Sequence, residues 1–146
     1  MRIYLDNCCF NRPFDMQNQD IIILESEAVL TIIERCAKND DWLFFSSDIL
    51  NDEMDNIIDP VKKQNVLCLY NFAEEHIELN ADILKRAFDL QSFNFGSYDA
   101  LHLASAENGG ADVFLTTDRK LIKHTEKVDL HVGVFNPFVW LSEVIV

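Results

Sequence analysis

The chain has 146 residues, of which 49% are hydrophobic, and it contains only 4 Gly and 3 Pro. These values predict a single compact domain over residues 1–146 and exclude a disordered or fibrous chain. No stretch reaches the roughly 18 continuous apolar residues of a membrane span, and Asp6 interrupts the apolar start in a way that excludes a signal peptide. We therefore expect a cytoplasmic protein without a membrane anchor.

The net charge of −13 comes from 25 acidic and 12 basic residues. Such a surface repels nucleic acid over most of its area, which excludes broad, non-specific binding of DNA or RNA. Two explanations stay open for the acids: they form a solvated face that keeps the protein soluble, or some of them converge on a bound cation. Both can hold at once.

The four cysteines show no metal or redox spacing. Cys8 and Cys9 are adjacent, Cys36 and Cys68 are isolated, and no CxxC motif occurs. In a reducing compartment such cysteines serve mainly as small hydrophobic residues. We expect half or more of them to be buried, and Cys8 and Cys9 to be packing residues rather than a redox or zinc pair.

The first half of the chain alternates apolar runs of strand and helix type. In chain order we expect a strand at 3–5, a helix at 21–37, a strand at 42–45, a helix at 48–58 capped by Ser46 or Ser47, and a helix from Pro60 to about Glu75.

The second half continues the alternation. We expect a strand at 76–79, a helix at 81–91 capped by Asn80, a helix at 98–108 capped by Ser97 and ended by Gly109 and Gly110, a strand at 113–116, a short helix opened by 118–120, a strand at 130–135 and a helix after Pro137. This order predicts an α/β fold of three layers, α/β/α, around a central, mostly parallel sheet of four to five strands. In such folds, ligands bind at the carboxyl ends of the strands.

Four acids occupy positions that lead to this edge of the sheet. Asp6 ends the first strand, and Asp118 follows the strand at 113–116. Glu53 lies within the apolar stripe of its helix, where an unpaired acid is costly, and Asp99 begins a helix that is apolar nearly all round. Each acid also has a purely structural explanation, as a turn residue, a helix cap, a rim residue or a partner of the helix dipole.

Taken together, the four positions favour a cation site. Carboxylates 4–5 Å apart repel each other by roughly 3–4 kcal/mol per pair at an effective dielectric constant near 20, so a cluster needs a counter-charge. Ligation by oxygen alone favours Mg²⁺ or Mn²⁺. Such ions are typical of metal-assisted phosphodiester hydrolysis.

Four stretches of the chain, IYLDNC, SSDILNDE, SYDALHLASAENGGADVFLTTDRKL and NPFVWL, are similar to the PIN domain, the metal-dependent nuclease fold of VapC-type toxins. The similarity runs along essentially the whole chain. Its specific part is the third stretch, in which an Asp begins an Ala-rich helix, followed by a Gly break, a strand and Thr-Thr-Asp.

The resemblance implies that Asp6, Glu53, Asp99 and Asp118 form an acidic set that binds Mg²⁺ or Mn²⁺, and these are the residues that their placement already selects. It also implies a metal-dependent endoribonuclease, the toxin of a type II toxin–antitoxin pair. RNA would be its substrate, an antitoxin protein its partner, and a homodimer its assembly.

One region departs from the family pattern. Asn7 stands where the family has Thr or Ser, and the stretch CCFNRPFDMQNQD precedes Ile21. The candidate substrate-binding residues are Asn7, Arg12, Thr117 and Arg119. For Arg12 a surface loop role is the alternative, and for Thr117 a capping role. His102 lies one turn after Asp99, and we expect a core histidine with satisfied hydrogen bonds rather than a phosphate contact.

Two other functions compete with the nuclease. A catalytically silent PIN-like module would use its acidic surface to bind a basic peptide, such as an antitoxin tail. A metal-dependent phosphatase of the haloacid-dehalogenase type would need a DxD motif after the first strand, and Asp6-Asn7-Cys8 lacks the second Asp.

Overall fold

The computed structural model describes residues 1–145. Its elements, in chain order, are β1 (Arg2–Leu5), α1 (Asn7–Asn11), the 3₁₀ turn η1 (Arg12–Phe14), α2 (Asp20–Lys38), β2 (Leu43–Ser47), α3 (Asp48–Asp55), α4 (Pro60–Tyr70), β3 (Glu75–Ile77), α5 (Ala81–Gln91), α6 (Ser97–Asn108), β4 (Val113–Leu115), α7 (Arg119–Thr125), β5 (Gly133–Phe135) and α8 (Pro137–Val144).

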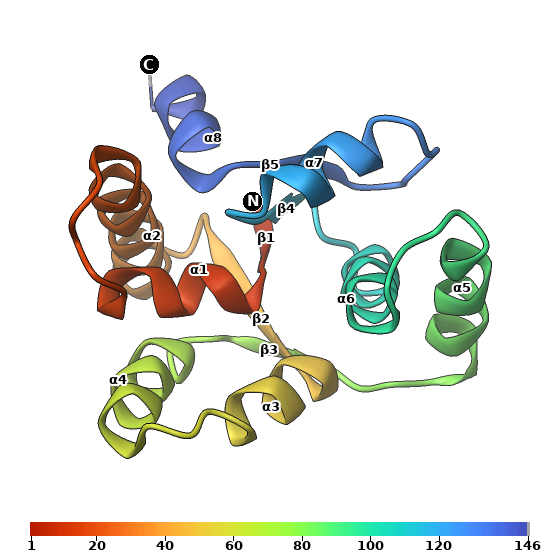
Figure 1. Ribbon diagram of the computed structural model, residues 1–146, viewed down its shortest axis with the longest axis horizontal. Coiled ribbons are helices and arrows are strands. Elements are labelled where there is room, and N and C mark those ends of the chain that lie inside the picture. The colour runs from red at the N-terminus through yellow and green to blue at the C-terminus, as the bar shows by residue number, and fades with distance from the viewer. Residues whose placement is uncertain (146) are drawn as a thin grey trace.

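The centre of the molecule is a five-stranded sheet in the order β3-β2-β1-β4-β5. Every pair of neighbouring strands is parallel. Helix α2 covers one side of the sheet, and α5 and α6 pack against each other on the other side (Figure 1). The predicted α/β fold with three layers and a parallel sheet is confirmed.

Strands β1 and β4 are apolar from Ile3 to Leu5 and from Val113 to Leu115, because both faces of the sheet are covered there. Ile3, Tyr4 and Leu5 of β1 are fully buried, as is Phe114 of β4. The rings of Tyr4 and Phe114 stack with centroids 5.2 Å apart. These contacts fix the carboxyl ends of β1 and β4 beside each other. The chain leaves the sheet there at Asp6 and at Thr116.

Several element boundaries differ from the sequence prediction. Helix α4 ends at Tyr70 rather than near Glu75, because the chain from Glu74 on is extended and pairs with β2, where the N–H of Glu74 donates to the carbonyl of Phe44. The cap of α6 is Gly96, and the expected cap Ser97 is its first helical residue. Ser47 and Asn80 do cap α3 and α5 through their side chains, as predicted.

The segment after Asp6 is helical rather than an extended loop. Helix α1 begins at Asn7, directly after its cap Asp6, and η1 follows it without a break. The extra residues that depart from the family pattern therefore form a short helix and a turn, and only the stretch at 15–19 lies outside regular structure.

Among the described residues, no helix combines the length and the apolar character that crossing a membrane requires.

Candidate metal centre

The pairing of β1 with β4 brings two of the predicted acids together. The backbone N–H of Asp6 donates to the carbonyl of Leu115 over 2.9 Å, so the chain after β1 runs beside the chain after β4. The hydroxyl of Thr116 donates to Oδ2 of Asp6 (2.8 Å) and accepts the backbone N–H of Asp118 (3.1 Å). Thr116 thereby links the two acids.

The other two acids arrive on helices. Glu53 lies on α3, which starts directly after β2, and Asp99 lies in the first turn of α6. The hydroxyl of Tyr98 donates to Oδ2 of Asp52 over 2.6 Å and so joins the start of α6 to α3. The two helices therefore present Glu53 and Asp99 at the same edge of the sheet.

All four predicted acids line one cleft of about 340 Å³. Its lining residues are Asp6, Asn7, Cys8, Asn11, Asp15, Glu53, Asp99 and Asp118. The convergence expected from the sequence is present, and it lies at the carboxyl ends of β1 and β4, where ligands bind in parallel α/β folds.

Two of the acids also have the structural roles that were their alternative explanation. Asp6 caps α1 by accepting the N–H of Asn7 at Oδ1 (2.8 Å). Asp118 caps α7 by accepting the N–H groups of Lys120 and Leu121 at Oδ1 (3.0 and 3.1 Å). A carboxylate offers about four acceptor positions, so both caps leave acceptor capacity directed at the cleft.

The electrostatics of the cleft favour a bound cation. Burial raises the pKa of the Asp6 carboxyl, which is 8% exposed, although the neighbouring His102 and the Thr116 hydroxyl oppose this. Burial also raises the pKa of Asp99, and the charges of Asp6 and Asp118 raise it further. Within residues 1–145 the Asp99 carboxylate accepts no hydrogen bond and forms no ion pair. A divalent cation would relieve these penalties.

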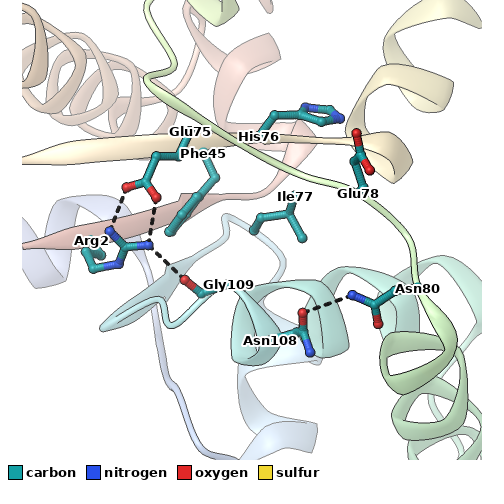
Figure 2. Close-up of a pocket in the computed structure, with 9 residues that line it drawn as sticks. All are labelled: Arg2, Phe45, Glu75, His76, Ile77, Glu78, Asn80, Asn108 and Gly109. Carbon is teal, nitrogen blue, oxygen red and sulfur yellow. Dashed lines mark hydrogen bonds and ion pairs between the residues drawn. The ribbon is translucent and has the colours of Figure 1, made fainter.

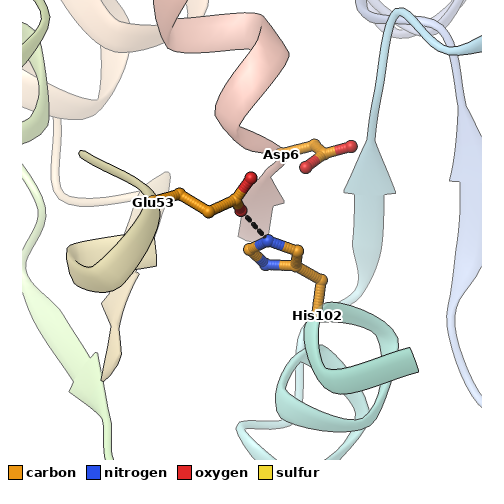
Figure 3. A group of neighbouring side chains, drawn as sticks. All are labelled: Asp6, Glu53 and His102. Carbon is orange, nitrogen blue, oxygen red and sulfur yellow. Dashed lines mark hydrogen bonds and ion pairs between the residues drawn. The ribbon is translucent and has the colours of Figure 1, made fainter. Parts of the chain in front are cut away.

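The donor atoms fit a divalent cation. One ligand atom each from Asp6, Glu53 and His102 lie within 4.8 Å of one another, and Figure 3 shows the Glu53 carboxylate against the His102 ring with Asp6 next to them. Carboxylate oxygens are ligands that Mg²⁺ and Mn²⁺ prefer, and both ring nitrogens of His102 are already engaged with Glu53 and Tyr4. The residues present therefore suit the group that the fold implies.

His102 has a more specific role than the sequence suggested. Its side chain is 1% exposed, as expected of a core histidine, but its Nε2 contacts the carboxylate of Glu53 (Figure 3). Its Nδ1 lies 2.7 Å from the hydroxyl of Tyr4. The spacing of three residues after Asp99 had placed it on the correct helix face, but only the packing of α6 on α3 identifies its partner.

The four candidate substrate-binding residues separate into two groups. Asn7 lines the acidic cleft, whereas Arg12, Thr117 and Arg119 line a neighbouring pocket of about 270 Å³. Nε of Arg12 lies 3.1 Å from the carboxylate of Glu25, which is 1% exposed. The alternative of a free surface loop arginine is therefore wrong for Arg12, because it forms an ion pair with a buried acid.

Three further residues of the cleft were not expected to belong to the site. Cys8, Asn11 and Asp15 come from the segment after β1. Asn7 and Asn11 are four residues apart, which places them on one face of α1, but a helix of five residues has too little periodicity to be recognised from sequence. Cys9 is a packing residue as predicted, whereas Cys8 is half-buried and borders the cleft.

A second cavity of about 300 Å³ lies beside β3 and the start of β1, and it shares no lining residue with the acidic cleft (Figure 2). Two of its charged groups pair with each other: both terminal nitrogens of Arg2 donate to the carboxylate of Glu75, over 2.6 and 3.1 Å. The Arg2 guanidinium also lies over the ring of Phe45 and donates to the carbonyl of Gly109. These contacts tie the edge strand β3 to β1 and engage the Arg2 guanidinium, and we place the candidate site in the acidic cleft.

Comparison with known proteins gives matches at the level of structure. No protein-family model and no curated protein matches the chain. The structure of VapBC2 from Rickettsia felis, bound to a DNA fragment from its promoter, matches with a TM-score of 0.65 at 15% identity, over 93% of this chain and 98% of that chain. The structure of PAE2754 from Pyrobaculum aerophilum matches with a TM-score of 0.51 at 12% identity, over 98% and 90%. At these identities the likeness concerns the fold, and the chain has the PIN-like fold that its sequence predicts.

Proposed function

We propose that this protein is a Mg²⁺- or Mn²⁺-dependent endoribonuclease, the toxin of a type II toxin–antitoxin pair. The observation that carries the proposal is the convergence of Asp6, Glu53, Asp99 and Asp118 on one cleft at the carboxyl edge of the sheet. The likeness to the VapBC2 structure over nearly the whole chain supports it.

The four carboxylates would hold the cation, with Asp6 oriented by the hydroxyl of Thr116. A cation held by these carboxylates would supply Lewis acidity toward a water molecule and the phosphodiester. Asn7 and Asn11, whose side chains bind each other over 3.1 Å at the rim of the cleft, offer amide groups to the sugar or phosphate of a bound strand. The acidic cleft itself would repel RNA without the cation, which makes binding depend on the metal.

The neighbouring pocket would receive the phosphate next to the one that is cut. Thr117 and Arg119 flank Asp118 in sequence, so this pocket borders the acidic cleft directly. Arg12 and Arg119 supply guanidinium groups, and Thr117 a hydroxyl, which are common phosphate donors. An Arg119→Gln variant should raise KM for an oligonucleotide more than it lowers kcat.

The protein would act in the cytoplasm and be held inactive by an antitoxin, and it would form a homodimer. The VapBC2 neighbour is a complex, which supports a protein partner here. The adjacent reading frame tests this directly: a small DNA-binding protein encoded there should co-purify with the chain and suppress its cleavage of RNA. Light scattering of the purified chain would measure its oligomeric state.

A cleavage assay tests the nuclease function. Purified protein with Mn²⁺ or Mg²⁺ should cut single-stranded or small structured RNA, and chelation with EDTA should abolish cutting. Asp6→Asn should lower the rate at least about 100-fold because the cation loses a central ligand. Asp40→Asn, which changes an exposed acid in a turn far from the cleft in sequence and structure, is the matched control and should cut like the wild type.

The catalytically silent binding module is the alternative outcome. Wild-type protein that cuts none of these RNAs and binds no Mn²⁺ at millimolar concentration would contradict the nuclease proposal and favour that module. Cleavage that persists in Asp6→Asn or in EDTA would indicate a contaminating ribonuclease.

A further inference from the structure

A chain of buried hydrogen bonds leads from the start of α3, through β1, to the acidic cleft. We infer that His102 is a positioning residue that orients the Glu53 carboxylate for the metal, and that Tyr4 and Ser47 hold His102 in the tautomer that this requires. The inference rests on the proposed function, because it assigns Glu53 to the metal centre.

This chain of hydrogen bonds connects residues that are far apart in sequence. Oγ of Ser47 lies 2.9 Å from the hydroxyl of Tyr4, which lies 2.7 Å from Nδ1 of His102. Nε2 of His102 contacts Oε1 of Glu53. Ser47, Tyr4 and His102 are each at most 1% exposed, so water does not compete for these bonds.

The direction of each bond follows from the carboxylate at one end. An ionised Glu53 can only accept, so Nε2 of His102 must donate, and a neutral imidazole then accepts at Nδ1. The hydroxyl of Tyr4 therefore donates to Nδ1 and accepts the hydroxyl of Ser47. Oγ of Ser47 in turn accepts the backbone N–H of Leu50 over 3.1 Å. One consistent set of donors and acceptors satisfies every group in the chain.

Glu53 needs such support more than the other three acids. Asp6 and Asp118 are fixed by backbone N–H groups as helix caps, and Asp99 has a short side chain on a twelve-residue helix. Glu53 has a longer side chain, is 25% exposed, and lies on a helix of eight residues. A Glu has one more side-chain torsion to fix than an Asp, and the bond to His102 restricts these torsions and keeps the carboxylate at the cleft.

The same chain of hydrogen bonds joins the strands and helices that carry the site residues. Ser47 ends β2 and caps α3, Tyr4 belongs to β1, and His102 belongs to α6. The position of Glu53 is thus tied to the strands that position Asp6. A shift of α3 relative to the sheet would break the hydrogen bond between Glu53 and His102.

Binding of Mn²⁺, measured by calorimetry on the purified protein, tests the inference without reference to RNA cleavage. His102→Leu keeps an apolar side chain of similar volume and removes the donor, and it should weaken Mn²⁺ binding by about 10- to 100-fold. His102→Gln can place an amide N–H near the position of Nε2 and should restore most of the affinity. Tyr4→Phe should weaken binding by a smaller factor, because the histidine remains but its tautomer is no longer set.

Thr125→Val is the matched control, because Thr125 is another buried residue whose hydroxyl donates to the carbonyl of Ile122 in α7 and contacts no member of the hydrogen-bond chain. It should leave Mn²⁺ affinity unchanged, and thermal melting confirms that each variant is folded. Equal Mn²⁺ affinity of wild type and folded His102→Leu would overturn the inference while leaving the metal-dependent function intact. The inference is also overturned if His102→Gln binds Mn²⁺ as weakly as His102→Leu does. A wild-type protein that binds no Mn²⁺ would instead overturn the proposed function, and the inference with it.

Discussion

At the scale of single residues, Asp6 and Asp118 show that a structural role and a site role are compatible. Each is a helix cap, as the most ordinary explanation of its sequence position suggests, and each also lines the cleft. Sequence placed all four acids at the correct edge because strand ends and helix starts are readable from apolar patterns. It missed the Glu53–His102 contact because the pairing of two helix faces is set by packing, which the pattern of a single helix does not encode.

The repulsion among the acids predicts that removing one charge stabilises the metal-free protein. Asp99→Asn should melt higher than wild type in EDTA, by about 3 °C for each kcal/mol of repulsion removed. Wild type should gain more from added Mn²⁺ than the variant does. Differential scanning calorimetry measures both effects, with Asp40→Asn as control. An Asp99→Asn variant that melts no higher than wild type would mean that the acids do not repel one another in the folded protein.

The raised pKa of Asp99 predicts how this difference depends on pH. Burial and the neighbouring acids make the folded protein hold the Asp99 proton to a higher pH than the unfolded chain does. From the ordinary carboxyl pKa near 4 up to the raised value, the unfolded state therefore binds fewer protons, and wild-type stability falls as the pH rises. Urea unfolding of both proteins in EDTA should give nearly equal free energies of unfolding at pH 4. As the pH rises, the free energy of unfolding of Asp99→Asn should come to exceed that of wild type, and this difference should level off above the pKa of Asp99 in the folded protein. A difference that is constant with pH would contradict this account.

At the scale of elements, the segment α1–η1 forms one wall of the cleft and is tied to the rest of the fold by charge. Arg12 in η1 pairs with the buried Glu25 of α2, and Oε2 of Glu25 also accepts a hydrogen bond from Asn136, the cap of α8 (2.6 Å). Asp15 pairs with both Arg12 (3.3 Å) and Lys62 (3.0 Å). None of these pairings is visible in the sequence, where the stretch lacks an apolar period and resembles a loop.

The burial of Glu25 predicts a large effect of Arg12 on stability. Arg12→Met should lower the free energy of unfolding by about 3 kcal/mol, because it leaves a buried carboxylate without its cation. Lys62→Met is the matched control, since its partner Asp15 is about one-third exposed, and it should cost less than about 1 kcal/mol. Urea unfolding measures both. Equal effects of the two substitutions would contradict an anchoring role of Arg12.

At the scale of the whole molecule, the order of the strands and the three layers follow from the alternation of strand and helix patterns and the rules of parallel sheets. The end of α4 does not follow from these patterns, because it is set by a tertiary contact, the pairing of the chain from Glu74 on with β2. The cleft is similar in this respect: its acids were predictable, whereas the wall made by Cys8, Asn11 and Asp15 depends on how a short helix docks.

The charge of the molecule limits how it holds RNA. With a net charge of −13 and two arginines beside the cleft, we expect few phosphate contacts. Binding of a cleavage-resistant phosphorothioate oligoribonucleotide to the wild-type protein with Mn²⁺ should therefore weaken only gently with salt, with a slope of log K against log salt no steeper than about −1.5. Fluorescence anisotropy across a salt series measures this slope. A slope of about −4 or steeper would indicate a larger basic surface than the pocket of Arg12 and Arg119.

The most direct test of the metal centre is anomalous diffraction from crystals grown or soaked with Mn²⁺. The account predicts an anomalous peak in the cleft, within coordination distance of carboxylate oxygens from Asp6 and from at least one of Glu53, Asp99 and Asp118. It also predicts that the peak disappears in Asp6→Asn. A wild-type crystal at millimolar Mn²⁺ with no peak in this cleft, or with its only peak elsewhere on the surface, would contradict it.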